Sequence, residues 1–387
     1  MISVLSKDLL AWFQEKQPEI EAMLEQLVNI DSGSACKAGV DQVADIMAEA
    51  YEKLGFAVEL LRHENCGNAV IARRPGRNSE KNLLLICHID TAFPPNYSAE
   101  HPYYVKDGRA YGNGVEDMKV CFINCLYAIK ALDELHVDPL VGITVLMSGD
   151  EEAGSISVLD EIKAEGKKAD WCIVTEGARA NGAFVKERKG NAQLDVWAHG
   201  RAAHAGNEPE KGRNAIEELA LKIVRLRQIA NPALGSTVTI GTIQGGKNRI
   251  LTAEDAAMQV DLRFRTLEEK SRMFAAVEEI LAQPEIDGVQ LRYELRYNRP
   301  PLTSVPGTEK LYASLKRISE VLEIPYLSAV AGGVSDGNFV ADMGVPTIDG
   351  LGPVGGMMCS PEEYLELDSI APRGARMAAL MADLVNL

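Results

Sequence analysis

The sequence predicts an α/β protein in which a mostly parallel, helix-covered sheet is interrupted by an inserted α+β domain of the ferredoxin-like type. Three observations support this prediction. Residues 1–187 alternate helical patterns with short, continuously apolar runs, which is typical of central strands covered on both faces. Between residues 188 and 298 the strands alternate apolar and polar positions, as in a sheet with one covered face. After the NRPP segment at 298–301, helical patterns and short apolar runs alternate again, so the second domain interrupts the first.

The first domain begins with an amphipathic stretch, residues 1–20, whose interspersed charges predict a helix rather than a signal peptide. Three apolar runs then predict buried strands: NLLLICHID at 82–90, LVGITVLMSGD at 140–150 and DWCIVTEG at 170–177. A helical pattern at 117–135 separates the first run from the second. Helices that separate apolar strands are the signature of a parallel sheet.

The second domain reads as β-α-β-β-α-β, which is the order of the split βαβ, ferredoxin-like arrangement. Its last strand, VQLRYELRY at 289–297, alternates apolar and polar residues at nearly every step. Beyond this strand, a helix near 307–322 and a short strand around VPTIDG return to the first domain. We therefore expect a discontinuous first domain, residues 1–187 and 299–387, and an inserted second domain, residues 188–298.

Composition excludes several classes of partner. The 387-residue chain carries 40 basic and 56 acidic residues, a net charge of −16, which works against nucleic acid or an anionic membrane as a partner. No stretch has the length and apolarity of a membrane span. Seven cysteines without regular spacing fit a reducing compartment, so we expect a cytoplasmic protein.

Polar side chains follow each of the three buried runs, at the point where the predicted strand ends. Open α/β sheets bind ligands at this edge, so these residues are interpreted together. Unneutralised carboxylates packed there would repel each other, and a divalent cation is the natural compensation. Nitrogen and oxygen donors suit zinc, with cobalt or manganese as alternatives. Taken singly, each residue also has an ordinary explanation as a helix cap or a solvated loop. The residues that follow the runs are His88, Asp90, Asp150, Glu151, Glu152 and Glu176, and a glycine-bracketed turn adds Asp117 at the start of the helix that follows the first run.

Five motifs in this order resemble one family of enzymes. They are HIDT at 88–91, GNGVEDMK at 112–119, SGDEEAGS at 148–155, TEG at 175–177 and GRAAHAG at 200–206. Together they resemble the co-catalytic dizinc amidohydrolases that include glutamate carboxypeptidase, acetylornithine deacetylase, succinyl-diaminopimelate desuccinylase and aminoacylase. The resemblance covers nearly the whole chain, the inserted domain included, which in this family serves as a lid and a dimerisation domain.

The resemblance implies a ligand set for two zinc ions. Asp117 would bridge the two ions, and the peptide bond after it is expected to be cis, as in relatives. His88 and Glu176 would complete the first zinc site. Glu152 would belong to the second.

The same resemblance assigns roles to the other acids. Asp90 would orient His88 and raise its basicity, as second partners of metal-bound histidines do. Glu151 would be the general base that takes a proton from water and passes it to the leaving amine. Asp150 is expected to be a structural residue of the loop.

The inserted domain would supply two further residues and a homodimer interface, through residues 188–298. By resemblance, His204 reaches across the interface to stabilise the oxyanion, a task suited to a preorganised donor. The alternative is an ordinary histidine of a surface loop. Arg263 alternates onto the polar face of its strand with Asp261, and relatives use the corresponding arginine to hold a substrate carboxylate. The alternative is that Arg263 only pairs with an acidic neighbour on that face.

The sequence departs from the family pattern at two positions. Relatives end with a histidine of the second zinc site, but the loop VGGMMCSPEEY places Cys359 there, and all six histidines lie before residue 205. Cys359 can be a thiolate ligand, it can leave the second metal weakly held or absent, or it can be small apolar filler. Ile250 stands where relatives have an asparagine that contacts substrate, with Asn248 close in sequence.

The function expected from this reading is metal-dependent hydrolysis of an amide or peptide bond adjacent to a carboxylate. The substrate would be a small N-acyl amino acid or peptide, as for a glutamate carboxypeptidase or a deacylase. The main alternative is a catalytically impaired member that binds a small molecule or a protein, which the changes at Cys359 and Ile250 favour. A third possibility, Cys359 as a nucleophile, has no histidine nearby in sequence to activate it.

Overall fold

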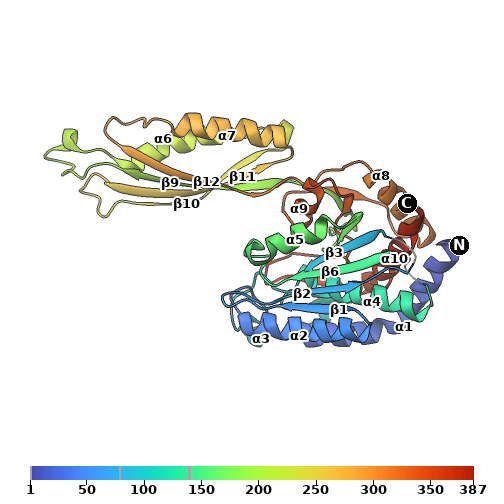
Figure 1. Ribbon diagram of the computed structural model, residues 1–387. Coiled ribbons are helices and arrows are strands. Elements are labelled where there is room, and N and C mark those ends of the chain that lie inside the picture. Colours follow the sequence, from blue (N-terminus) through green and yellow to red (C-terminus); the bar gives the residue numbers. More distant parts are fainter. Residues whose placement is uncertain (1, 78–79, 138–140) are drawn as a thin grey trace. The chain divides into compact units, whose positions relative to one another are not determined.

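The chain folds into two compact units, each with its own apolar core (Figure 1). The computed structural model describes residues 2–77, 80–137 and 141–387. In this part of the chain, no helix combines the length and the apolarity that crossing a bilayer requires. Unit 1 comprises Met1–Glu187, Thr303–Val330 and Ser335–Leu387, and unit 2 comprises Arg188–Leu302 and Ala331–Val334.

Unit 1 contains a six-stranded sheet in the order β1-β2-β6-β3-β7-β14. Strand β2 runs antiparallel to both of its neighbours, and the remaining neighbouring pairs are parallel. The predicted mostly parallel sheet is therefore confirmed, and the three apolar runs form its central strands β3, β6 and β7. The bounds are β1 (Ala57–Leu61), β2 (Ala69–Arg74), β3 (Asn82–His88), β6 (Gly142–Ser148), β7 (Trp171–Val174) and β14 (Thr347–Ile348).

Helices cover both faces of this sheet, as the unbroken apolar runs predict. Leu83 and Leu85 of β3 pack into one core, and Leu84 and Ile86 pack into another on the opposite face. In the part of the chain that the structure describes, helices close both cores. On the first face lie α1 (Ile2–Val28), α2 (Lys37–Lys53), α4 (Val120–Glu134), α8 (Thr308–Val321) and α10 (Ile370–Asp383), and on the second lie α5 (Leu159–Gly166) and α9 (Gly337–Asp342).

A second, small antiparallel sheet of unit 1 has the order β15-β16-β5-β4. It joins segments that are more than 240 residues apart, because Tyr364 of β16 pairs with Tyr111 of β5. Strands of two or three residues carry no readable periodicity, and the sequence did not predict them. The bounds are β4 (Tyr104–Lys106), β5 (Arg109–Tyr111), β15 (Gly355–Gly356) and β16 (Tyr364–Glu366), and the remaining elements are α3 (Tyr97–Glu100), β8 (Phe184–Arg188) and β13 (Ser328–Ala331).

Unit 2 contains a four-stranded antiparallel sheet in the order β10-β11-β9-β12, with α6 and α7 packed on one face (Figure 1). The alternating residues of the strands explain this one-sided cover: Val260 and Leu262 enter the core, whereas Asp261 and Arg263 do not. The order of elements is the predicted β-α-β-β-α-β: β9 (Gly190–His199), α6 (Ala215–Arg227), β10 (Thr237–Gly245), β11 (Asp255–Phe264), α7 (Leu267–Leu281) and β12 (Gln290–Arg299).

Candidate metal centre

His88 is the last residue of β3, and its imidazole lies beside two carboxylates from other segments. Its Nε2 is 3.4 Å from Oδ1 of Asp117 and 3.6 Å from Oε1 of Glu176. Glu176 follows β7, the parallel neighbour of β3, by two residues. Parallel neighbours end at the same edge of a sheet, which is why these side chains meet.

Asp117 lies in a tight turn, Val115–Lys119, that leads into helix α4. The peptide bond between Asp117 and Met118 is cis, as we expected from the family resemblance. The carboxylate extends in two directions: Oδ1 lies near Nε2 of His88, and Oδ2 lies 3.4 Å from Sγ of Cys359. Asp117 therefore lies between His88 and Cys359 and contacts both of them.

Cys359 lies in the loop between β15 and β16, and its sulfur reaches the acids of the cluster. Besides its contact with Asp117, Sγ lies 3.9 Å from Oε1 of Glu152. The thiol is shorter than an imidazole, yet the loop brings its sulfur into contact with both carboxylates. His88, Asp117 and Glu152 each offer one donor atom within 4.8 Å of the others, which is compatible with a shared cation.

Asp90 holds both His88 and the loop that follows β6. Nδ1 of His88 lies 3.0 Å from the backbone oxygen of Asp90 and 3.4 Å from its Oδ1. The two carboxylate oxygens accept the backbone N–H groups of Glu151 and Glu152, at 3.0 and 3.1 Å. Ser34 donates its hydroxyl to Oδ2 at 2.7 Å. These contacts fix the ring of His88 and the backbone of the acidic loop.

Glu363 is a buried acid of the site that the sequence did not single out. Its Oε1 accepts the backbone N–H groups of Glu116 and Asp117, at 2.9 and 3.1 Å. Its Oε2 accepts the N–H of Cys359 at 3.2 Å. The only signal in the sequence was its place in the Glu-Glu-Tyr run after Cys359, which does not reveal these partners.

The consecutive acids Asp150, Glu151 and Glu152 have different surroundings in the structure. Asp150 accepts the backbone N–H and the hydroxyl of Ser157, at 3.0 and 2.9 Å, and its backbone oxygen accepts the N–H of Ser155. Its carboxylate is therefore occupied in closing its own loop, as we expected. Glu151 is half-buried at the same edge of the sheet, immediately before Glu152.

The electrostatics of the cluster favour a cation. Burial disfavours a charged imidazole, but hydrogen bonds to Asp117 and other acids outweigh it and raise the pKa of His88 well above its usual value. Burial, with repulsion from Asp117, raises the pKa of Glu152 to about 7 although His88 opposes this shift. Burial, followed by repulsion from Asp117 and Glu152, also raises the pKa of the Cys359 thiol. A divalent ion supplies the missing positive charge, and metal binding displaces protons from such ligands.

His204 lies in an exposed loop of unit 2, where its ring is fixed by backbone groups. Nδ1 accepts the N–H groups of Gly206 and Asn207, at 3.1 and 3.2 Å, so the neutral ring carries its proton on Nε2. The backbone of this loop pairs with the next loop, since Ala205 donates to the oxygen of Ile250 at 3.0 Å. The Asn248 side chain accepts the N–H of Ile250, so it caps its own loop.

Arg263 lies on the face of the unit 2 sheet that α6 and α7 leave open. Its Nε donates to Oδ1 of Asp261 at 2.7 Å, and its Nη1 donates to the backbone oxygen of Gly332 at 3.4 Å. The pairing with an acidic neighbour, one of the two interpretations of the sequence, is therefore present in the structure.

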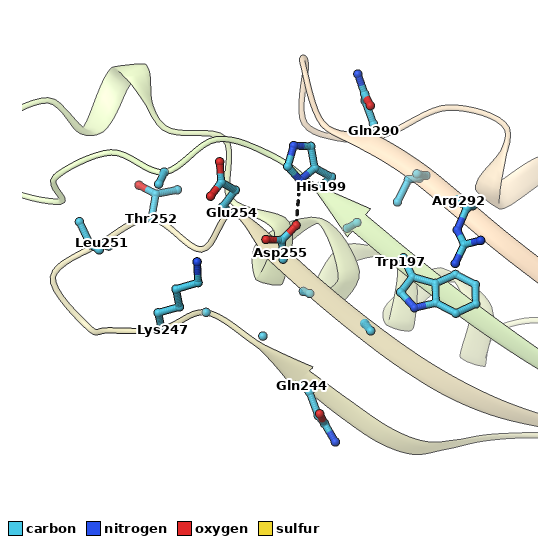
Figure 2. A pocket seen from close by; sticks show the side chains of 17 residues that line it. Trp197, His199, Gln244, Lys247, Leu251, Thr252, Glu254, Asp255, Gln290 and Arg292 are labelled. Atoms are coloured by element: carbon cyan, nitrogen blue, oxygen red, sulfur yellow. Dashed lines mark hydrogen bonds and ion pairs between the residues drawn. The ribbon is translucent and has the colours of Figure 1, made fainter.

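Unit 2 also has a cavity of about 670 Å³ near the end of its sheet (Figure 2). The Arg292 guanidinium lies over the ring of Trp197, 4.0 Å from its centroid, and His199 pairs with Asp255 at 2.8 Å. Lys247 and Glu254 also line it. This mixture of charges favours no single ligand, and none of the predicted site residues lines the cavity.

The fold is that of an α/β protein, and His88, Asp117 and Glu152 form a candidate metal-binding group at the carboxyl edge of its parallel sheet. Residues 84–383 match the family described as "Peptidase family M20/M25/M40", and the chain belongs to this family. The predicted resemblance is therefore confirmed, and at the level of the family the protein is a zinc-dependent hydrolase of peptide or amide bonds.

Two curated relatives agree with this assignment, and solved structures share the fold. The chain is 29% identical to carboxypeptidase G2 of Pseudomonas sp. (strain RS-16), covering 96% of this chain and 90% of the relative. It is 26% identical to succinyl-diaminopimelate desuccinylase of Azoarcus sp. (strain BH72), covering 84% of this chain and 88% of the relative. A tripeptidase from Staphylococcus aureus has a similar fold, with a TM-score of 0.80 at 18% identity, covering 96% of this chain and 99% of that one. Aminopeptidase PepT from Bacillus cereus also has a similar fold, with a TM-score of 0.77 at 21% identity, covering 95% of this chain and 99% of that one.

Proposed function

We propose that this protein hydrolyses an amide or peptide bond next to a carboxylate, most like a glutamate carboxypeptidase or an N-acyl amino acid deacylase. The likeness to a carboxypeptidase and to a desuccinylase supports this substrate class. The observation that carries the proposal is one cluster in which an imidazole, a thiol and several carboxylates meet within contact distance; its members are His88, Asp117, Glu152, Glu176 and Cys359.

The donor atoms suit zinc, which accepts nitrogen, oxygen and thiolate ligands. Asp117 would be shared by two ions, because its two oxygens point to different members of the cluster. His88 and Glu176 would complete the first ligand set, and Glu152 and Cys359 the second. When bound, the ions would lower the pKa of a water molecule and polarise the scissile carbonyl.

The residues around the ligands would carry out the proton transfers. Glu151 would take the proton of the attacking water and deliver it to the leaving amine. Asp90 would support this step indirectly, because it holds both the ring of His88 and the backbone N–H of Glu151.

Two residues of unit 2 would act on the substrate. His204 can donate from Nε2 to an oxyanion, since its Nδ1 is already an acceptor. The planar guanidinium of Arg263 suits a substrate carboxylate, although its pairing with Asp261 supports a purely structural role equally well. Hydrolysis of N-acyl-glutamate and of the matching glutamine derivative distinguishes these roles: a loss of discrimination in Arg263→Ala supports substrate binding.

The proposed function is tested by measuring zinc per chain together with hydrolysis of a panel of N-acyl amino acids and dipeptides. Two zinc ions and cleavage of a carboxylate-bearing substrate are expected. A protein that binds ligands of this class tightly but cleaves none would instead be the impaired binding protein. The position of the Cys359 sulfur supports the enzyme, because it lies 3.4 Å from Oδ2 of Asp117 and 3.9 Å from Oε1 of Glu152, two proposed ligands.

Substitution of Cys359 tests the second ligand set directly. Cys359→Ser should weaken the second zinc by at least about 100-fold, the upper end for loss of an indirect partner, and Cys359→His should restore it. Competition with a zinc chelator measures both affinities. Cys66→Ser, at a half-buried cysteine outside the cluster, is the control. Equal zinc affinity in all variants would show that Cys359 only fills space and is not a metal ligand. A nucleophilic role is disfavoured because burial, together with the nearby acids Asp117 and Glu152, raises the pKa of the Cys359 thiol.

We propose that unit 2 forms a homodimer. Leu221 and Val224 are three residues apart on α6 and are 44% and 60% exposed, an apolar surface of the kind that partners cover. Val224→Glu should convert a dimer to a monomer, measured by light scattering after size exclusion. Val4→Glu, at a 66% exposed position of α1, should leave the mass unchanged. A monomeric wild-type protein would contradict the proposal.

We also propose a reducing compartment such as the cytoplasm. Among the described residues no cysteine forms a disulfide. A thiolate ligand at Cys359 requires the same conditions, since oxidation would remove its metal-binding form.

A further inference from the structure

Glu363 connects two segments of the metal centre that lie far apart in the sequence. One carboxylate oxygen accepts the N–H groups of Glu116 and Asp117, and the other accepts the N–H of Cys359. We propose that Glu363 is a positioning residue that sets the separation of Asp117 and Cys359 and thereby shapes the second metal position. The inference rests on the proposed function, because it assumes that Cys359 is a ligand.

The place of Glu363 in the fold suits this role. It is only 2% exposed and directly precedes β16, whose first residue, Tyr364, pairs with Tyr111 of β5. The chain runs from β5 into the turn that carries Asp117, so the small sheet anchors Glu363 beside that turn. A carboxylate anchored in this way can hold backbone N–H groups on both sides without moving.

The loop that carries Cys359 requires such an anchor. Both Met357 and Cys359 have positive φ angles, 57° and 58°, a region that residues with a side chain rarely adopt. Backbone of this kind persists only where surrounding contacts hold it. The hydrogen bond from Cys359 N–H to Glu363 is one of these contacts, and it directs the sulfur toward Asp117.

A direct ligand role for Glu363 is disfavoured by the same hydrogen bonds. Its two oxygens are both oriented toward backbone N–H groups rather than toward the donor atoms of the cluster. Asp90 acts in the same manner on the opposite side, where it accepts the N–H groups of Glu151 and Glu152. Each segment that supplies a ligand to the second position is therefore held by a buried carboxylate.

The test uses the full chain loaded with cobalt(II), whose thiolate charge-transfer absorption reports a Cys359–metal bond. Glu363→Gln keeps the size of the side chain but replaces one acceptor oxygen by a donor, so one of the two segments loses its partner. The second cobalt should bind about 10–100-fold more weakly, as for other partners of metal ligands, and the thiolate band should weaken. Affinity for the first cobalt, whose proposed ligands include His88 and Glu176 as well as the shared Asp117, should fall less than affinity for the second.

Glu362→Gln is the matched control, because Glu362 is the exposed neighbour and its carboxylate accepts the hydroxyl of Ser360 at 3.2 Å. It should keep both the band and the second affinity. If Glu363→Gln keeps them as well, the inference is wrong. If the wild-type protein binds two ions without a thiolate band, Cys359 is not a ligand, and the proposed ligand set fails instead.

A folding defect would be recognised by circular dichroism. In that case Glu363→Asp, which keeps both oxygens on a shorter side chain, replaces the first variant. Glu363→Asp should also weaken binding of the second cobalt and the thiolate band, but less than Glu363→Gln does. Wild-type values in a folded Glu363→Asp protein would overturn the inference.

Discussion

Asp117→Asn is expected to remove the metal centre while leaving the fold intact. Its two oxygens lie near Nε2 of His88 and Sγ of Cys359, so this single carboxylate connects both ligand groups. An amide offers one oxygen and no negative charge, which leaves the two ions unshielded from each other. Zinc content should fall from two ions to below one per chain, and kcat/KM should fall by about 10⁴-fold or more, the scale seen for essential members of a catalytic unit.

Zinc content by plasma emission spectrometry and kinetics on the best substrate of the panel measure this prediction. Asp160→Asn, at an exposed position of α5, serves as the control and should change neither value. A variant at Asp117 that retained two tightly bound ions would show that the acids of the cluster do not share a cation.

Glu151→Gln is expected to reduce turnover and to leave metal binding unchanged. The backbone of Glu151 is held by Asp90, so the neutral side chain should keep its place, and the ligands of the cluster are other residues. Loss of a general base typically costs about 10²–10⁴-fold in rate. The loss should appear in kcat rather than in KM, because the base acts during the chemical step.

The pH profile separates this role from a structural one. The acidic limb of the kcat profile should disappear in Glu151→Gln, while zinc content and the melting temperature match the wild-type protein. Glu64→Gln, at an exposed position outside the cluster, should behave as wild type. An unchanged kcat in Glu151→Gln would assign the proton transfers to another group.

The sequence alone predicted the residues at the ends of the parallel strands. His88, Glu152 and Glu176 could be grouped because continuous apolar runs predict parallel central strands, and the carboxyl ends of such strands meet at one edge. The two-sided core of the sheet and the one-sided core of unit 2 were also readable, since burial imposes a periodicity on each strand.

The contacts of the Cys359 sulfur and the hydrogen-bond partners of Glu363 could not be predicted from strand patterns. Both depend on β15, β16 and β5, which are too short for any periodicity, and β16 pairs with β5 across more than 240 residues. The sequence showed only that a thiol stood in the place of an imidazole. Whether its sulfur reached Asp117 depended on how far the loop extends, which local residue preferences do not specify.

The class of fold, the family resemblance and the edge of the sheet at which the acids gather could all be predicted from the sequence. These features follow from patterns of burial that are repeated along each strand. The tertiary structure was needed to show that Sγ of Cys359 lies 3.4 Å from Oδ2 of Asp117 and that the Glu363 carboxylate accepts backbone N–H groups from both segments. Long-range backbone hydrogen bonds set those positions, and such bonds depend on how distant segments meet in space rather than on the order of residues within either segment.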